Sequence, residues 1–165
     1  MQEKSVWDML FEWLENNAFT KIFSESIWLY PAVEIIHIVG FAVLVGAAIM
    51  YDLRLLGLSR QMSVTDATQH LTVWARLSLI AVIPSGLILF MVGATTLSVN
   101  SAFQIKLVLI VSAGINATIF HLFTLKTADT WNKNVSTPVA ARIAGFISII
   151  LWISIIACGR LIAYV

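Results

Sequence analysis

Four long apolar runs dominate the pattern of hydrophobic and polar positions along this chain. They cover residues 27–50, 77–97, 103–125 and 138–163, and shorter segments richer in polar residues separate them. A helix needs roughly 20 residues to cross the hydrocarbon core of a bilayer, and each run is about that long. The pattern therefore predicts an all-α fold, an integral membrane four-helix bundle.

Residues that favour helix starts stand before two of these runs. Ser63 and Asp66 resemble a capping box, so we expect the second helix to begin in water and to enter the membrane near Arg76. Thr137 is predicted to be the N-cap of the last helix, with Pro138 at its first helical position.

The N-terminal segment differs from the four apolar runs. Residues 5–18 predict an amphipathic helix that lies flat in the membrane interface and carries a narrow acidic stripe: Asp8, Glu12 and Glu15. An acidic stripe does not favour anionic lipid, and it leaves room for contact with a partner. We therefore divide the chain into an N-terminal interfacial helix, residues 1–26, and a four-transmembrane-helix bundle, residues 27–165.

Composition supports this class and excludes others. Hydrophobic residues make up 59% of the chain and charged residues 12%, against roughly 25% charged residues in soluble domains. A net charge of +1 provides no basic field for nucleic acid. The single cysteine, Cys158, excludes an intrachain disulfide. No phosphate-binding glycine loop, HExxH pair or Gly-x-Ser-x-Gly motif is present, so the sequence identifies no enzyme class.

The distribution of basic residues predicts the orientation. The side that holds the connections 51–76 and 126–142 carries six Lys and Arg residues, against four on the opposite side. Positively charged connections favour the cytoplasm, so both termini are expected on the other side. If the host is a Gram-negative bacterium, the expectation is a multi-pass protein of the bacterial inner membrane with both termini in the periplasm.

Ionisable residues inside the first apolar run are the first candidates for a functional site, because such residues are rare and costly in lipid. One helix face combines them with apolar and acidic positions at three- and four-residue spacing: Glu34, His37, Phe41, Leu44, Ala48 and Asp52. We expect this face to point into the bundle. Gly40 would let a neighbouring helix or a flat cofactor come close. Glu34 is expected to pair with Lys106 or Arg160, or else to carry a proton or bind a metal.

The three histidines carry the cofactor hypothesis. His37 and His121 lie in separate predicted helices, where neutral imidazoles can hold haem iron or another metal, and His70 could replace either one. Counted along parallel helices, however, His37 and His121 differ in depth by about 12 Å. Arg54 and Arg76 would meet haem propionates, or would instead set topology or bind phospholipid headgroups.

Several motifs resemble a group of bacterial four-span membrane proteins of unknown function. The resemblance extends from about Trp28 to Val165. It rests on four motifs: Glu34-Ile-Ile-His37-Ile-Val-Gly40, Asp52-Leu-Arg54-Leu-Leu-Gly57, Asn116 followed by His121, and Gly159-Arg160. The chain is also distantly similar to the membrane part of copper-resistance D proteins and to four-helix b-type cytochromes. The nearer group implies a fold and a location, and the distant ones imply redox or copper chemistry near membrane histidines.

Three functional hypotheses follow. The first is a haem-b-binding electron-transfer subunit, with His37 and His121 as axial ligands; copper, or no cofactor, are the alternatives. The second is a non-catalytic membrane anchor that assembles with a membrane or periplasmic partner. The third is transport of a metal ion or protons through the bundle along Glu34 and His37. In each case the protein is expected to form a homo-oligomer or to bind a partner in the lipid bilayer.

Overall fold

The computed structural model describes residues 5–58 and 60–165, and every regular element in this part of the chain is helical. Four segments are long and apolar enough to cross a membrane. They are α3 (Leu29–Leu55), α4 (Val64–Val92), α6 (Ser101–Ile119) with its continuation, and α7 (Val139–Leu161). The continuation of α6 consists of a π-helical turn, η1 (Phe120–Thr124), and a 3₁₀ segment, η2 (Leu125–Thr130). The prediction of four apolar helices long enough to span a membrane is thus confirmed.

Polar side chains define the helix starts. The Ser63 hydroxyl accepts a hydrogen bond from the backbone N–H of Asp66 at 3.2 Å, which confirms the predicted cap of α4. Thr137 was predicted to cap α7, but Pro138 is its N-cap and Val139 its first helical residue. Pro138 has an extended backbone, with φ −56° and ψ 149°, so the helix begins one residue later than predicted.

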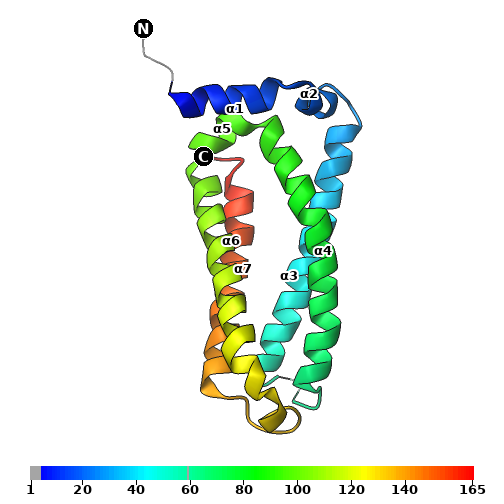
Figure 1. The fold of residues 1–165 in the computed structure, drawn as a ribbon, viewed down its shortest axis with the longest axis vertical. Helices are drawn as coiled ribbons and strands as arrows, with labels where there is room; N and C mark the ends of the chain where they lie inside the picture. The colour runs from blue at the N-terminus through cyan, green and yellow to red at the C-terminus, as the bar shows by residue number, and fades with distance from the viewer. Residues whose placement is uncertain (1–4, 59) are drawn as a thin grey trace.

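The N-terminal segment forms two helices rather than the one predicted: α1 (Val6–Asn16) and α2 (Ala18–Ser24). Asn17 causes the break, because its side-chain oxygen accepts a hydrogen bond from the backbone N–H of Thr20 at 2.9 Å and so starts a new helix. Both helices lie across the end of the bundle near the C-terminus (Figure 1). Residues 1–4 of the predicted segment lie outside the described residues.

A polar contact fixes α1 to the bundle. The short helix α5 (Ala94–Val99) follows α4, and its residue Thr95 donates two hydrogen bonds to the Glu15 carboxylate, from the backbone N–H at 3.2 Å and from the hydroxyl at 2.5 Å. One member of the predicted acidic stripe is therefore used within the chain. We call this end of the molecule the terminal end, and the opposite end, with the two connecting loops, the loop end.

The four long helices pack as two pairs, α3 with α4 and α6 with α7, joined by contacts between α3 and α7 (Figure 1). Two glycines allow the closest approaches. A Cβ on Gly40 would lie 2.9 Å from Val82 of α4, and a Cβ on Gly145 would lie 3.2 Å from the backbone oxygen of Asp52. Within the described residues, α4 and α6 form no comparable packed interface.

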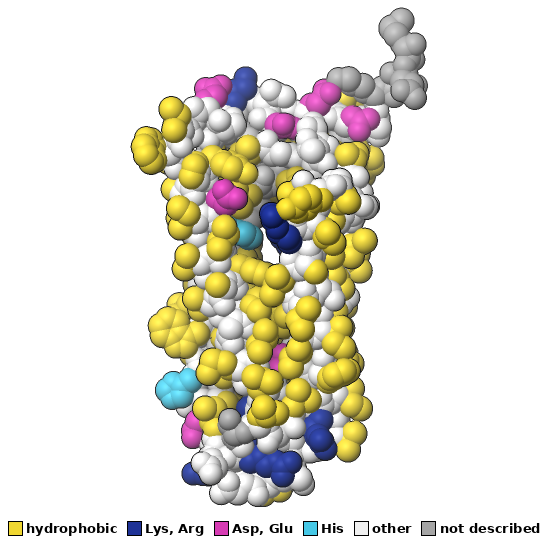
Figure 2. Space-filling model, turned by 180° about the vertical axis from the view of Figure 1, so that it is seen from behind, with side chains coloured by type: hydrophobic (Ala, Val, Ile, Leu, Met, Phe, Trp, Pro, Cys, Tyr) yellow, Lys and Arg dark blue, Asp and Glu magenta, His cyan; other side chains and the backbone are white. Residues whose placement is uncertain are grey.

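The two ends of the bundle are filled differently. A buried cluster closes the loop end, and it consists of Leu55, Val64, Phe120, Ala128, Trp131 and Ala141. The outer surface of the long helices is largely apolar along their length (Figure 2), with many exposed Ile, Val and Leu side chains. Such a surface suits contact with lipid rather than water.

Candidate functional site

A cavity of about 800 Å³ lies between the two helix pairs. Its walls are mostly apolar. It is partly open to the surroundings because, over the described residues, α4 and α6 stack the rings of Phe90 and Phe103 at the terminal end but form no extended packed interface. Seen from the opposite side, Figure 2 shows a hollow bordered by one histidine and one basic side chain. A volume of this size is in the range of sites for small molecules and cofactors.

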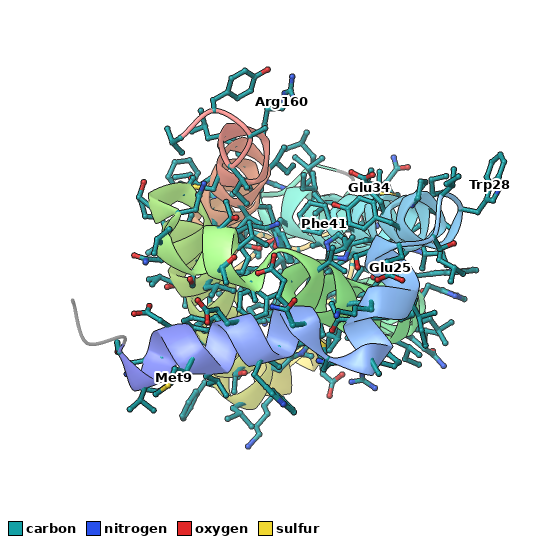
Figure 3. The ribbon with its side chains drawn as sticks, turned by 90° about the horizontal axis from the view of Figure 1, so that it is seen from above. Met9, Glu25, Trp28, Glu34, Phe41 and Arg160 are labelled. Carbon is teal, nitrogen blue, oxygen red and sulfur yellow. The ribbon has the colours of Figure 1, made fainter. Side chains whose placement is uncertain are left out.

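The predicted inward face of α3 lines this cavity, with one exception. His37, Phe41, Leu44, Ala48 and Asp52 all border it. The exception is Glu34, an exposed residue on the outer side of α3, whereas Phe41 points inward (Figure 3). The expectation that Glu34 faces the bundle interior was therefore wrong. It lies near the end of α3, where a carboxylate can reach water and need not be buried.

The expected ion pair of Glu34 is also not formed. Among residues 5–58 and 60–165, Glu34 pairs with neither Lys106 nor Arg160. Arg160 donates a hydrogen bond to the hydroxyl of Tyr164 and lies over its ring, 4.9 Å from the centroid. Lys106 faces the cavity instead.

The hydrogen bonds of His37 determine where its ring proton lies. Its Nδ1 is 3.2 Å from the backbone oxygen of Val82 and 3.0 Å from the hydroxyl of Ser85. That hydroxyl donates its own proton to the carbonyl of Ala81 at 2.6 Å, and the Val82 carbonyl can only accept. Nδ1 therefore carries the proton and donates it, and Nε2 keeps a free lone pair.

This arrangement is typical of a metal-ligating histidine. Such imidazoles usually donate one ring N–H to a carbonyl or carboxylate, which orients the ring and fixes the tautomer, while the other nitrogen binds the metal. His37 borders the cavity, and among the described residues its Nε2 has no hydrogen-bond partner.

Small and aromatic residues surround the His37 ring. A Cβ on Gly86 would lie 3.0 Å from the ring carbon Cε1, so only glycine leaves room for the imidazole against α4. Phe41 stacks nearly parallel to the ring, with centroids 6.4 Å apart, and Trp152 of α7 meets Phe41 edge-on at 6.2 Å. Gly40, expected to admit a helix or a cofactor, packs against α4 and does not border the cavity.

Ring contacts also give the relative heights of α3 and α6, which run in the same direction. Tyr51 and Phe120 touch edge-on, with centroids 5.8 Å apart. Counting 14 residues back along each helix places His37 level with Lys106, and both side chains border the cavity. His121 lies 15 residues beyond Lys106, which corresponds to about 22 Å along the axis.

The two candidate imidazoles therefore border the same cavity at opposite ends. His121 sits in the π-helical turn η1 near the loop end. His70 is exposed on α4 and does not border the cavity. In the part of the chain that the structure describes, no three His, Cys, Asp or Glu side chains gather in a way that could hold a metal ion. The structure thus places one imidazole at each end of the cavity, rather than two imidazoles that face each other.

Lys106 is a cation that has no counter-ion among residues 5–58 and 60–165. It is partly buried, borders the cavity, and forms no hydrogen bond or ion pair with any described residue. A Cβ on Gly159 would lie 3.7 Å from its Nζ, an ordinary van der Waals distance, so the lysine lies beside the end of α7. A bound anionic group would supply the missing partner, since an unpaired charge in an apolar cavity is costly.

Arg54 does not reach the cavity. Only 1% of its surface is exposed, and the guanidinium points into the loop end. Its Nε donates to the backbone oxygen of Met62 at 2.6 Å and Nη2 to that of Asn132 at 2.8 Å. The expectation that Arg54 meets a haem propionate was therefore wrong, because both donors are used to hold connecting loops. Arg76, by contrast, is exposed and borders the cavity.

Sequence reasoning placed Asp52 on the inward face but did not recognise it as a site residue. It is 5% exposed, and its Oδ2 has no hydrogen-bond partner among the described residues. Ser148 of α7, which lies beside this carboxyl, was missed entirely. The periodicity that singled out His37 continues for 15 residues to Asp52 and could have identified it.

Comparisons with known proteins place the chain in a family without giving it an activity. The chain matches a family of unknown function, DUF6644, over residues 10–165. There is no significant match among the curated proteins or the solved structures.

Proposed function

We propose that this protein, which belongs to the DUF6644 family of unknown function, binds haem b in the bundle cavity. It acts there as a membrane electron-transfer subunit. The proposed setting is a bacterial inner membrane, with both termini outside the cytoplasm. Haem b held in this way supplies a one-electron carrier, which matches a chain in which we identify no other catalytic group.

One observation carries the proposal. The Nδ1 proton of His37 is committed to Val82 and Ser85, so Nε2 is the free nitrogen of a fixed ring beside a cavity of about 800 Å³. A histidine with only a packing role would not need a bare nitrogen at an apolar cavity wall, since unpaired polar atoms in such places are costly. His37 is therefore the proposed axial ligand.

The remaining residues have supporting roles in this proposal. Gly86 and Ser85 keep the imidazole in one orientation, Phe41 and Trp152 provide a flat aromatic wall, and Lys106 supplies a positive charge for a propionate. His121 has no part in this site, because its level differs from that of His37 by about 22 Å. The proposal thus differs from the sequence-based one in using a single histidine of this chain.

Optical spectroscopy tests the proposal directly. The full chain, expressed with added haem precursor and purified in mild detergent, should show a Soret band that shifts on reduction. His37→Gly should abolish the band, and added imidazole should restore part of it by occupying the vacated space. His70→Ala and His121→Ala are matched controls that should leave the band unchanged.

The same experiment can refute the proposal. A colourless wild-type protein, or a His37→Gly protein that keeps its full Soret band, would exclude it. A colourless protein that copurifies with a stoichiometric partner would favour the non-catalytic anchor instead. Loss of the band in His121→Ala as well as in His37→Gly would restore the original pair of axial ligands, through two protomers.

A further inference from the structure

The loop end of the cavity has polar groups of its own. Asp52 on α3, Asn116 on α6 and Ser148 on α7 all border it. The side-chain nitrogen of Asn116 donates to the backbone oxygen of Ala144 at 3.0 Å, and the next residue, Gly145, packs against the backbone of Asp52. Asn116 and Asp52 therefore both contact the turn of α7 that leads to Ser148.

The Asp52 carboxyl has no cation to balance it. It is 95% buried, since 5% of its surface is exposed, and Oδ2 has no partner among the described residues. Arg54, two residues away, directs its guanidinium to loop carbonyls instead. The side-chain nitrogen of Asn116 donates a hydrogen bond to Ala144, and the side-chain carbonyl oxygen of Asn116 remains as a second acceptor. A ligand group that is positively charged and donates hydrogen bonds would satisfy both oxygens.

A guanidinium and an imidazole lie at the mouth of the same region. Arg76 of α4 and His121 of η1 both border the cavity and are exposed, and the Arg76 charge acts on the His121 ring. Arg76 and His121 belong to α4 and to the continuation of α6, and no extended packed interface between these two helices closes that side of the cavity. Neither has a hydrogen-bond partner among residues 5–58 and 60–165. A phosphate at this mouth would be held by a guanidinium and an imidazole.

Depth places this region at the level of lipid headgroups. Glu34 is an exposed charged residue near the start of α3, and Asp52 lies 18 residues further along the same helix. This separation corresponds to about 27 Å, close to the roughly 30 Å thickness of a bilayer hydrocarbon core. The long side chain of Arg76 can reach the same level from higher on α4.

From this charge pattern, with bases at the mouth and a buried acid behind them, we propose that the loop end of the cavity binds a phospholipid whose headgroup carries a primary ammonium group. The phosphate contacts Arg76 and His121, the ammonium donates to Asp52 and Asn116, and the acyl chains leave between α4 and α6. A phosphatidylglycerol headgroup has no ammonium to satisfy Asp52. A choline headgroup has the charge but no N–H to donate.

Native mass spectrometry of the full chain tests this assignment. The protein is delipidated and then titrated with phosphatidylethanolamine, phosphatidylglycerol or phosphatidylcholine of identical acyl chains. The wild type should retain one phosphatidylethanolamine with about tenfold preference over each of the others, the factor expected for one hydrogen bond to a charged group. Asp52→Asn should reduce this preference to near unity, and Arg76→Gln should weaken binding of all three lipids.

Matched variants and a separate readout make the result decisive. Asp66→Asn and Lys133→Gln remove exposed charges at the same end and should keep the preference. Equal retention of the three lipids by the wild type, or an unchanged preference in Asp52→Asn, would overturn the assignment. The inference is independent of the haem proposal, because Asp52, which distinguishes the headgroups, lies about 22 Å from His37 along α3. The Soret band should be the same in Asp52→Asn and wild type, so the two proposals can fail separately.

Discussion

Replacing Arg54 by methionine should destabilise the loop end of the bundle without emptying the cavity. Arg54 is the largest fully buried side chain, and its guanidinium joins the end of α3 to two loops through the backbone oxygens of Met62 and Asn132. Methionine retains most of the apolar volume but donates no hydrogen bond. Both carbonyls then lose their partner in a region that water reaches poorly.

The size of the effect follows from these contacts. A hydrogen bond that involves a charged group contributes roughly 1.5–3 kcal/mol, so losing two costs about 3–6 kcal/mol. Part of this is recovered, because Nη1 of Arg54 is buried with no partner in the described part of the chain, and its desolvation penalty disappears with the side chain. We therefore expect the free energy of unfolding to fall by about 3 kcal/mol, which is more than a hundredfold in the equilibrium constant.

Equilibrium unfolding in mixed detergent micelles, followed by circular dichroism, measures this change. Arg60→Met is the matched control, because Arg60 is exposed at the same end, and it should alter the free energy of unfolding by less than about 0.5 kcal/mol. If Arg54 instead held a haem propionate, the variant would lose the Soret band at unchanged stability. A change below about 1 kcal/mol in Arg54→Met would refute the structural role.

Three further predictions concern the cavity and its rim. Gly114→Phe should fill the cavity and abolish cofactor binding, because a side chain there meets no atom within 4 Å. Gly46→Phe is equally unobstructed but lies outside the cavity, so this variant should bind haem normally. Haem content per protein distinguishes the two variants. Gly86→Ala should push the His37 ring away from α4 and weaken haem binding by about tenfold through loss of its Nδ1 hydrogen bond, measured by haem titration. Glu34→Gln should leave haem content and stability unchanged, because Glu34 lies outside the cavity. If this variant instead abolished proton or metal-ion flux in proteoliposomes, the transport hypothesis would be supported.

Local sequence signals predicted most of the helical framework. The Ser63 cap and the four apolar runs translate directly into helices, because length and hydropathy are properties of each segment by itself. The errors occur where a single side chain overrides the pattern. Asn17 splits the N-terminal helix by capping α2, and Pro138 delays the start of α7 by one residue.

The candidate site was predicted less completely, for a different physical reason. Helical periodicity correctly grouped His37, Phe41 and Asp52 on one face, since residues at that spacing share a direction. The same rule misplaced Glu34, because periodicity does not say where along a helix the neighbouring helices end. The cofactor role expected for Arg54 came from its position near the inner membrane surface, and it was wrong because loops distant in sequence supply the carbonyls that the guanidinium binds.

The amino-acid sequence alone therefore determined that the chain forms four apolar helices with imidazole and carboxyl groups on an inward face, since segment length and periodicity are local properties. Only the tertiary structure decided which of these groups meet. The Tyr51–Phe120 contact sets the relative height of two helices, and this register brings Lys106 level with His37 while keeping His121 at the other end. Helix register depends on packing between segments far apart in the chain, which no local pattern encodes.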